Sequence, residues 1–176
     1  MREFAADPPV EERLGDALRA DGATLAVAES CTGGLIGSLV TDVPGASDYF
    51  DRALCTYSND AKQALLAVPR EALDEHGAVS APVARRMAAG VRDTAGTTWG
   101  LATTGIAGPS GGTAEKPVGT AFVGVAYAGA WGSGESYARA SRYELDGDRR
   151  ELKERIARRA LRDLVSAVDD APEPDG

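Results

Sequence analysis

The segment TLAVAESCTGGLIGSLV, residues 24–40, decides the fold because its hydrophobic pattern changes in the middle. Its first five residues, 24–28, form an apolar run typical of a buried strand, whereas residues 35–40 fit the period of a helix. The tight turn between them holds three potential nucleophiles followed by two glycines: Ser30, Cys31, Thr32, Gly33 and Gly34. The glycines let a substrate come close to the backbone at this turn.

The chemistry expected of this turn follows from the helix that it starts. The first N–H groups of a helix lack partners and the helix dipole adds positive potential, so such a turn favours an anion or an oxyanion. The structural alternative is an N-capping turn that opens a helix of small residues. The rest of the chain has to decide between these two interpretations.

Composition limits the class of protein. The 176 residues suffice for one domain with its own core, and 43% of them are hydrophobic. The sequence has neither a signal-peptide pattern nor an apolar run of about 18 residues, so we expect a cytoplasmic protein without a membrane span. The cysteines, Cys31 and Cys55, lack C-x-x-C spacing, which argues against a disulfide framework and a structural zinc site. We expect no metal and no cofactor.

The charge balance argues against nucleic acid as a partner. The chain has 27 acidic and 19 basic residues, a formal net charge of -8, and such a surface repels a phosphate backbone. Only Lys62, Lys116 and Lys153 are lysines. An acidic, lysine-poor surface is typical of adaptation to high salt, and a GC-rich genome is the alternative explanation.

The pattern of elements predicts the fold class. Helices are expected over residues 10–20, 35–41, 61–68, 71–76, 81–94 and 150–168, and strands over 24–28, 53–57, 99–103, 118–128 and 135–144. Because strands and helices alternate and the last two strands form a hairpin, we predict an α/β fold, a three-layer α/β/α sandwich with a mixed, mainly parallel sheet. Residues 10–168 form the domain, between a flexible arm at 1–9 and a disordered acidic tail at 169–176.

Lys62 occupies an unusual place for a cation. It lies in the first turn of the predicted helix 61–68, after N-caps at 58–60, where the helix dipole disfavours a positive charge by roughly 0.3 to 1 kcal/mol. A surface lysine that reaches into water is one interpretation. In the other, the dipole and burial lower the pKa of Lys62 until its neutral amine acts as a base. The single histidine, His76, is expected at a helix C-terminus, which weakens mechanisms that need a histidine base.

A glycine-rich loop follows the strand at 99–103. Residues 104–117, TGIAGPSGGTAEKP, match neither G-x-G-x-x-G nor G-x-x-x-x-G-K-[ST], so no dinucleotide or triphosphate site is indicated. The loop is either a nest of N–H groups that binds an anion or a flexible surface loop. Ligands of α/β sheets bind at the carboxyl ends of strands, where the Ser30 turn, residues 57–62 and this loop all fall.

Five stretches carry a resemblance to one known family: AESCTGG at 28–34, TYSNDAK at 56–62, HGAVSAPV at 76–83, TGIAGPSGGTAEKPVGTAF at 104–122 and GDR at 147–149. In these motifs the chain resembles the C-terminal domain of the competence and damage inducible CinA family, over residues 10–168. The stand-alone members of the family include nicotinamide-nucleotide amidase. The resemblance implies an α/β/α fold and a Ser/Lys-type amidase that converts nicotinamide mononucleotide to nicotinate mononucleotide and ammonia.

The resemblance also implies a role for each matching residue. Ser30 is expected to be the nucleophile, Lys62 its base, and Tyr57 a hydroxyl beside them that passes a proton to departing ammonia. Backbone N–H groups of the turn are expected to stabilise the oxyanion: Cys31, Thr32, Gly33 and Gly34. The other residues expected to bind the substrate are Asn59, Thr104, Gly105, Ile106, Ala107, Gly108 and Arg149.

Two alternatives stay open. Cys31 is a rival nucleophile, although its thiol would have to act without histidine or a second cysteine. The other alternative is a non-catalytic nucleotide-sensing or partner-binding module tied to competence or damage responses.

We expect a pyridine mononucleotide as the small-molecule partner and a homo-oligomer as the assembly. Many family members also carry a preceding domain that resembles molybdopterin-binding proteins, and its pyrophosphatase activity is not expected of residues 10–168.

Overall fold

The computed structural model describes residues 6–171. The strands are β1 Leu25–Glu29, β2 Phe50–Cys55, β3 Trp99–Gly105, β4 Thr120–Tyr127 and β5 Tyr137–Glu144. The helices are α1 Val10–Ala20, α2 Leu35–Thr41, α3 Asn59–Leu66, α4 Arg70–His76, α5 Ala81–Ala95 and α6 Arg149–Asp169, with a 3-10 turn at Ala46–Asp48. Helix α6 extends one residue into the predicted tail. Residues 6–9 of the predicted arm and 170–171 of the predicted tail belong to no helix or strand, whereas residues 1–5 and 172–176 lie outside the described residues.

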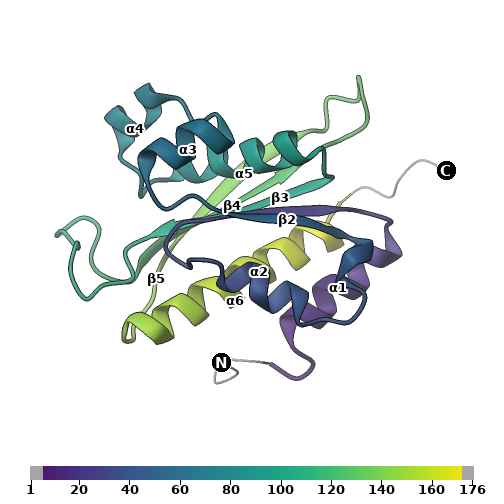
Figure 1. The fold of residues 1–176 in the computed structure, drawn as a ribbon, viewed down its shortest axis with the longest axis horizontal. Coiled ribbons are helices and arrows are strands. Elements are labelled where there is room, and N and C mark those ends of the chain that lie inside the picture. Colours follow the sequence, from purple (N-terminus) through teal and green to yellow (C-terminus); the bar gives the residue numbers. More distant parts are fainter. Residues whose placement is uncertain (1–5, 172–176) are drawn as a thin grey trace.

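The strands form one mixed sheet in the order β2-β1-β3-β4-β5. Strand β1 pairs in parallel with β2 and β3, whereas β4 runs antiparallel between β3 and β5. Helices α1, α2 and α6 cover one face of the sheet, and α3, α4 and α5 cover the other (Figure 1). The predicted three-layer α/β/α sandwich and its terminal hairpin are therefore confirmed. None of the helices within residues 6–171 combines the length and apolar character needed to cross a membrane.

Strand β2 differs from its predicted range, 53–57. It begins at Phe50 and ends at Cys55, because Thr56 and Tyr57 leave the sheet. The carbonyl oxygens of these two residues instead accept hydrogen bonds from Lys62. The early end of β2 thus creates a binding place for a lysine side chain.

Helix α5 packs directly on the backbone of the central strands. A Cβ atom at Gly100 of β3 would lie 2.1 Å from the carbonyl oxygen of Ala88, and one at Gly124 of β4 would lie 2.2 Å from that of Ala84. Only glycine permits this approach. The close packing fixes the start of α5, and the residues just before it, against the sheet.

A buried charge cluster joins the first and last helices on the opposite face. The Arg158 side chain of α6 is fully buried and donates to Glu11 of α1 at 2.8 Å and to Glu154 at 3.0 Å. A charged group inside a protein is tolerated only with such partners. Arg158 therefore ties α1 to α6 through charge as well as through apolar packing.

We expect Arg158→Met to lower the free energy of unfolding by about 3 to 5 kcal/mol, because it leaves two buried carboxylates without the guanidinium between them. Urea denaturation followed by circular dichroism measures the change. The matched control is Arg162→Met, which removes an exposed arginine from the same helix and should change stability by less than about 0.5 kcal/mol. Equal effects of the two variants would contradict the role assigned to Arg158.

Candidate active site

The candidate site lies where the sheet order reverses. From β1 the chain passes through α2 to β2 on one side, and then through α3, α4 and α5 to β3 on the other side. A crevice forms at the carboxyl ends of strands at such a reversal. The Ser30 turn follows β1 there, and the Ser30 N–H donates to the Thr103 carbonyl of β3 at 3.0 Å.

A cavity of about 200 Å³ opens at this edge. Its walls come from the segments that follow β1 and β2, from α3, from the residues before α5, from the end of β3 and the loop after it, and from the start of α6: Ser30, Cys31, Tyr57, Lys62, Ala78, Val79, Thr104, Gly105, Ala107 and Arg149. The lining residues include two basic side chains, Lys62 and Arg149, and no carboxylate. In a chain with a net charge of -8, the guanidinium of Arg149 gives this edge a local positive charge that favours an anionic ligand.

Ser30 and Lys62 form the chemical centre of the cavity. The Lys62 side chain is fully buried, and its Nζ donates to Ser30 Oγ at 3.2 Å. The same Nζ donates to the carbonyl oxygens of Thr56 at 2.8 Å and Tyr57 at 3.2 Å. Burial lowers the pKa of Lys62 below its ordinary value of 10.5.

This arrangement suits a neutral amine that takes a proton from serine. A neutral lysine has two N–H bonds and one lone pair, and the two carbonyl oxygens account for both N–H bonds. The lone pair then faces Ser30 Oγ, and the amine can accept the hydroxyl proton. The protonated form keeps the same three neighbours, so proton transfer requires no rearrangement of Lys62. Nucleophile and base are thus within hydrogen-bond reach, as serine activation requires.

The first turn of α2 is not free to bind an anion. The N–H groups of Gly34, Ile36 and Gly37 donate to the Glu29 carboxylate, at 3.0, 3.1 and 2.9 Å. The N–H of Gly33 donates to the Ser30 carbonyl at 3.2 Å. The prediction that Gly33 and Gly34 stabilise an oxyanion is therefore wrong, because both N–H groups already have protein acceptors. Among the four predicted donors, only Cys31 belongs to the residues that line the cavity, so its N–H remains as the candidate.

The two residues after Ser30 have buried side chains. Burial raises the pKa of the Cys31 thiol to about 12, and the negative charge of Glu29 adds to this effect. The thiol is therefore protonated at neutral pH, which argues against Cys31 as the nucleophile. The Thr32 hydroxyl is hydrogen-bonded to the Thr103 hydroxyl at 2.8 Å beneath the turn. Thr32 is 0% exposed and is not among the residues that line the cavity.

Tyr57 lies at the rim of the cavity with 64% of its surface exposed. Its hydroxyl accepts a hydrogen bond from Arg149 at 3.5 Å, and the Arg149 guanidinium also donates to the Gly108 carbonyl. The direct contact of Tyr57 with Lys62 is made by its carbonyl oxygen. A proton relay through the Tyr57 hydroxyl stays a prediction. Arg149 links the segment after β2 to the loop after β3.

The predicted loop begins later than expected, because Thr104 and Gly105 continue β3 and pair with β4. Both residues line the cavity, as does Ala107. The Thr104 hydroxyl donates to the Ala78 carbonyl at 2.8 Å and so fixes the segment before α5. The Ile106 N–H is engaged by the Thr120 carbonyl at 2.8 Å, which closes the base of the loop.

Six predicted binding residues are not among those that line the cavity, namely Thr32, Gly33, Gly34, Asn59, Ile106 and Gly108. Asn59 is exposed at the start of α3, and its carbonyl accepts from Gln63. Conversely, Ala78 and Val79 line the cavity although no role was predicted for them. Their position in the HGAVSAPV motif, just before the N-cap Ser80, was the available signal.

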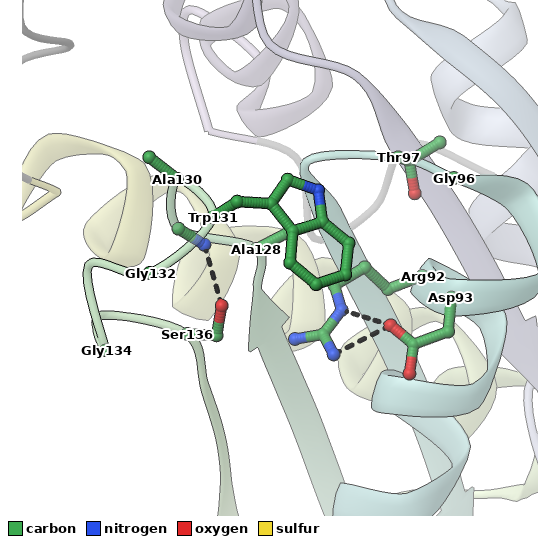
Figure 2. A pocket seen from close by; sticks show the side chains of 11 residues that line it. Arg92, Asp93, Gly96, Thr97, Ala128, Ala130, Trp131, Gly132, Gly134 and Ser136 are labelled. Atoms are coloured by element: carbon green, nitrogen blue, oxygen red, sulfur yellow. Dashed lines mark hydrogen bonds and ion pairs between the residues drawn. The ribbon is translucent and has the colours of Figure 1, made fainter.

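A second cavity is larger, about 590 Å³, but lies at the other end of β3 (Figure 2). The loop 128–136 forms one wall, with the exposed indole of Trp131, and the C-terminal end of α5 forms the other. Its charged groups, Arg92 and Asp93, form an ion pair with each other at 2.7 Å. It contains no pair of nucleophile and base. Chemistry rather than size therefore identifies the Ser30 cavity as the candidate active site.

The fold and the site together define an α/β/α protein with a buried serine–lysine pair at the carboxyl edge of its sheet. The model of the CinA C-terminal domain matches residues 7–168. The chain therefore belongs to the CinA C-terminal domain family.

Relatives and solved structures agree with this assignment. A CinA-like protein of Chlorobium limicola is 45% identical over 168 residues, and one of Salinibacter ruber is 52% identical over 155 residues. These matches cover 96% and 88% of the chain, but only 39% and 36% of the relatives' own length. The crystal structure of a competence/damage inducible protein from Agrobacterium tumefaciens has a TM-score of 0.81 at 36% identity, covering 93% of this chain and 98% of that one. A CinA superfamily protein from Klebsiella pneumoniae gives 0.84 at 29% identity, with coverages of 92% and 97%.

Proposed function

We propose that this chain is an amidase that hydrolyses the carboxamide of nicotinamide mononucleotide to nicotinate mononucleotide and ammonia. The observation that carries the proposal is the buried Lys62 Nζ at 3.2 Å from Ser30 Oγ, with two carbonyl oxygens as its other partners. A purely structural lysine has no need of a nucleophile at that position. A lysine of lowered pKa in a cavity is typical of a catalytic base.

The first half of the proposed reaction forms an acyl-enzyme. Ser30 Oγ attacks the amide carbon while Lys62 takes the hydroxyl proton. The tetrahedral oxyanion accepts a hydrogen bond from the N–H group of Cys31. The C–N bond then breaks, and the amide nitrogen leaves as ammonia with the proton that Lys62 carried. Tyr57, at the rim, is proposed to assist this transfer.

The second half returns the enzyme to its starting state. Water attacks the nicotinoyl ester and gives a proton to Lys62, which now acts as base for the second time. The ester C–O bond breaks, Ser30 recovers its proton from Lys62, and nicotinate mononucleotide leaves. One base thus serves both halves, and no metal ligand takes part in any step.

The charge of the cavity supports a phosphorylated substrate. Lys62 lies at the reacting end, whereas Arg149 lies among the lining residues beside the exposed Tyr57. A guanidinium binds phosphate well through two parallel hydrogen bonds. A cavity of about 200 Å³ is smaller than the roughly 300 to 1,000 Å³ typical of ligand pockets, so we place the carboxamide inside and the ribose phosphate at the rim.

Ammonia release tests the proposal directly. The purified chain is incubated with nicotinamide mononucleotide and, as matched controls, with nicotinamide, its riboside and NAD. We expect release from the mononucleotide at the highest kcat/KM, because only that substrate places a terminal phosphate at Arg149. Binding of the mononucleotide without any ammonia release would favour the alternative, a non-catalytic nucleotide-sensing module.

The lowered pKa of Lys62 predicts the pH dependence of the reaction. The base must be neutral to accept a proton, so kcat/KM should rise with pH and level off above an apparent pKa lower than 10.5. Rates on nicotinamide mononucleotide are measured above pH 7, where the second ionisation of the phosphate, with a pKa of about 6, no longer contributes. A kcat/KM that falls with rising pH between pH 7 and 10 would contradict Lys62 as the base.

A further inference from the structure

Glu29 is a buried charged residue at the site that the proposed reaction does not use. It is the last residue of β1, it directly precedes Ser30, and it is 0% exposed. Its carboxylate accepts hydrogen bonds from three backbone N–H groups, those of Gly34, Ile36 and Gly37. A carboxylate at the start of a helix also interacts favourably with the helix dipole. The Glu29 side chain therefore anchors the first turn of α2 to the end of β1.

The Ser30 turn bends back so that the N–H groups that follow it point to the Glu29 carboxylate. Gly33 and Gly34 have φ values of +60° and +93°, left-handed conformations that reverse the chain direction toward the Glu29 side chain. The Gly33 N–H donates to the Ser30 carbonyl within the turn, and the Ser30 N–H donates to the Thr103 carbonyl of β3. Ser30 is thus fixed to the sheet on one side, and on the other to a helix that Glu29 holds in place.

The main chain of Glu29 also reaches the other half of the site. Its carbonyl oxygen accepts from the Thr56 N–H at 2.8 Å, and the Thr56 carbonyl accepts from Lys62 Nζ at 2.8 Å. The backbone of Glu29 therefore locates the segment that holds the base, whereas its side chain locates the turn that holds the nucleophile. A change in the side chain alone affects only the second of these connections.

We propose that Glu29 is a positioning residue: its carboxylate holds the Ser30 turn so that Ser30 Oγ stays within hydrogen-bond reach of Lys62 Nζ. This inference rests on the proposed function of Ser30 and Lys62. Geometry carries it, since three hydrogen bonds of 2.9 to 3.1 Å converge on one buried side chain next to the nucleophile. A small displacement of reacting groups, of about 1 Å, can reduce a rate by about 100-fold.

The charge of Glu29 has a second effect, on the choice of nucleophile. Cys31 is among the residues that line the cavity, and it packs in an apolar cluster with Ala121 and Ile156. The negative charge of Glu29 opposes formation of a thiolate there and adds to the effect of burial on the pKa of Cys31. Burial is the main reason why this sulfur stays protonated, and the charge of Glu29 only adds to it.

The main test is Glu29→Gln, which keeps the length of the side chain. An amide has only one acceptor oxygen, and its NH₂ group would face one of the three N–H donors. We expect kcat for nicotinamide mononucleotide to fall about 10- to 100-fold with KM within about 3-fold, because the bound substrate is held by other residues. The matched control, Thr41→Val, removes a hydroxyl that donates to the Gly37 carbonyl at the far end of α2, and it should leave kcat unchanged.

A second measurement does not depend on nicotinamide mononucleotide. A fluorophosphonate forms an O–P bond with an activated serine and releases fluoride, so its labelling rate reports how well Ser30 is activated. Glu29→Gln should label at least about 10-fold more slowly than the wild type, whereas Thr41→Val should label equally fast. Glu29→Asp provides the reserve variant if Glu29→Gln does not fold. Aspartate retains the negative charge, but its side chain is one methylene too short to reach the N–H groups of α2, so this variant should also be labelled slowly.

The outcomes separate this inference from the proposed function. If the fluorophosphonate labels the wild-type protein but nicotinamide mononucleotide is not hydrolysed, the proposed substrate is contradicted. The labelling rates of the wild type and Glu29→Gln still test the role of Glu29. Wild-type kcat and labelling in folded Glu29→Gln would overturn the positioning role. A similar loss of kcat in Thr41→Val would also overturn the positioning role, because any loss of a hydrogen bond in α2 would then be enough to lower the rate.

Discussion

Ser30→Ala should reduce ammonia release by at least about 1,000-fold and leave the protein folded. The loss is large because no other group at this edge of the sheet combines a hydroxyl with contact to the amine of Lys62. The structure should tolerate the change, since only one oxygen atom is removed and Lys62 keeps its bonds to the carbonyls of Thr56 and Tyr57. Ammonia release and the melting temperature are measured on the same preparation.

The matched control for Ser30→Ala is Cys31→Ser, in the next position of the same turn. Burial keeps the Cys31 thiol protonated, so its replacement should change kcat/KM by less than about 10-fold. Activity that survives in Ser30→Ala but is lost in Cys31→Ser would make Cys31 the nucleophile. A large loss of melting temperature in Ser30→Ala would mean that Ser30 supports the turn rather than the chemistry.

The sequence predicted the elements that bring Ser30 and Lys62 together. The change of period at residues 24–40 identified β1, the turn and α2, because a buried strand and a helix differ in local spacing. The contact between residues 30 and 62 joins two segments that follow neighbouring parallel strands. Alternation of strands and helices was enough to predict that these segments meet at one edge of the sheet.

The sequence did not reveal the hydrogen-bond partners of the Glu29 side chain or those of the Lys62 side chain. Every residue of β1 is buried, and nothing in the local pattern indicates that the Glu29 carboxylate turns back to the N–H groups of α2. The expected oxyanion site at Gly33 and Gly34 was wrong for this reason. Likewise, two of the Lys62 acceptors become available only because β2 ends at Cys55, and strand ends depend on tertiary contacts that local propensity does not encode.

The expected result for Lys62→Arg separates a structural cation from a catalytic amine. Arginine keeps the positive charge and most of the stem, but it stays protonated in proteins and cannot accept the proton of Ser30. If Lys62 only balanced charge, Lys62→Arg would retain activity and Lys62→Ala would not. As a general base contributes about 100- to 10,000-fold, we expect both variants to lose kcat/KM to that extent.

Two controls distinguish loss of the base from loss of the fold. Lys116→Arg changes another lysine whose Nζ donates to a backbone carbonyl, that of His76, and it should retain activity within about 2-fold because Lys116 does not line the cavity. Circular dichroism shows whether the buried guanidinium of Lys62→Arg is accommodated. Lys62→Ala leaves space beside Ser30, so a small primary amine added to that variant should restore part of the rate.

The double variants complete the argument for Lys62. Residues that act as one unit lose activity non-additively, since removing the second partner costs little once the first is gone. Adding Lys62→Arg or Lys62→Ala to Ser30→Ala should therefore lower the residual rate by less than about 3-fold. Losses that multiply would mean that the two residues act independently. Near wild-type hydrolysis of nicotinamide mononucleotide by Lys62→Arg would overturn the mechanism, because a permanently protonated side chain at position 62 cannot be the base for Ser30.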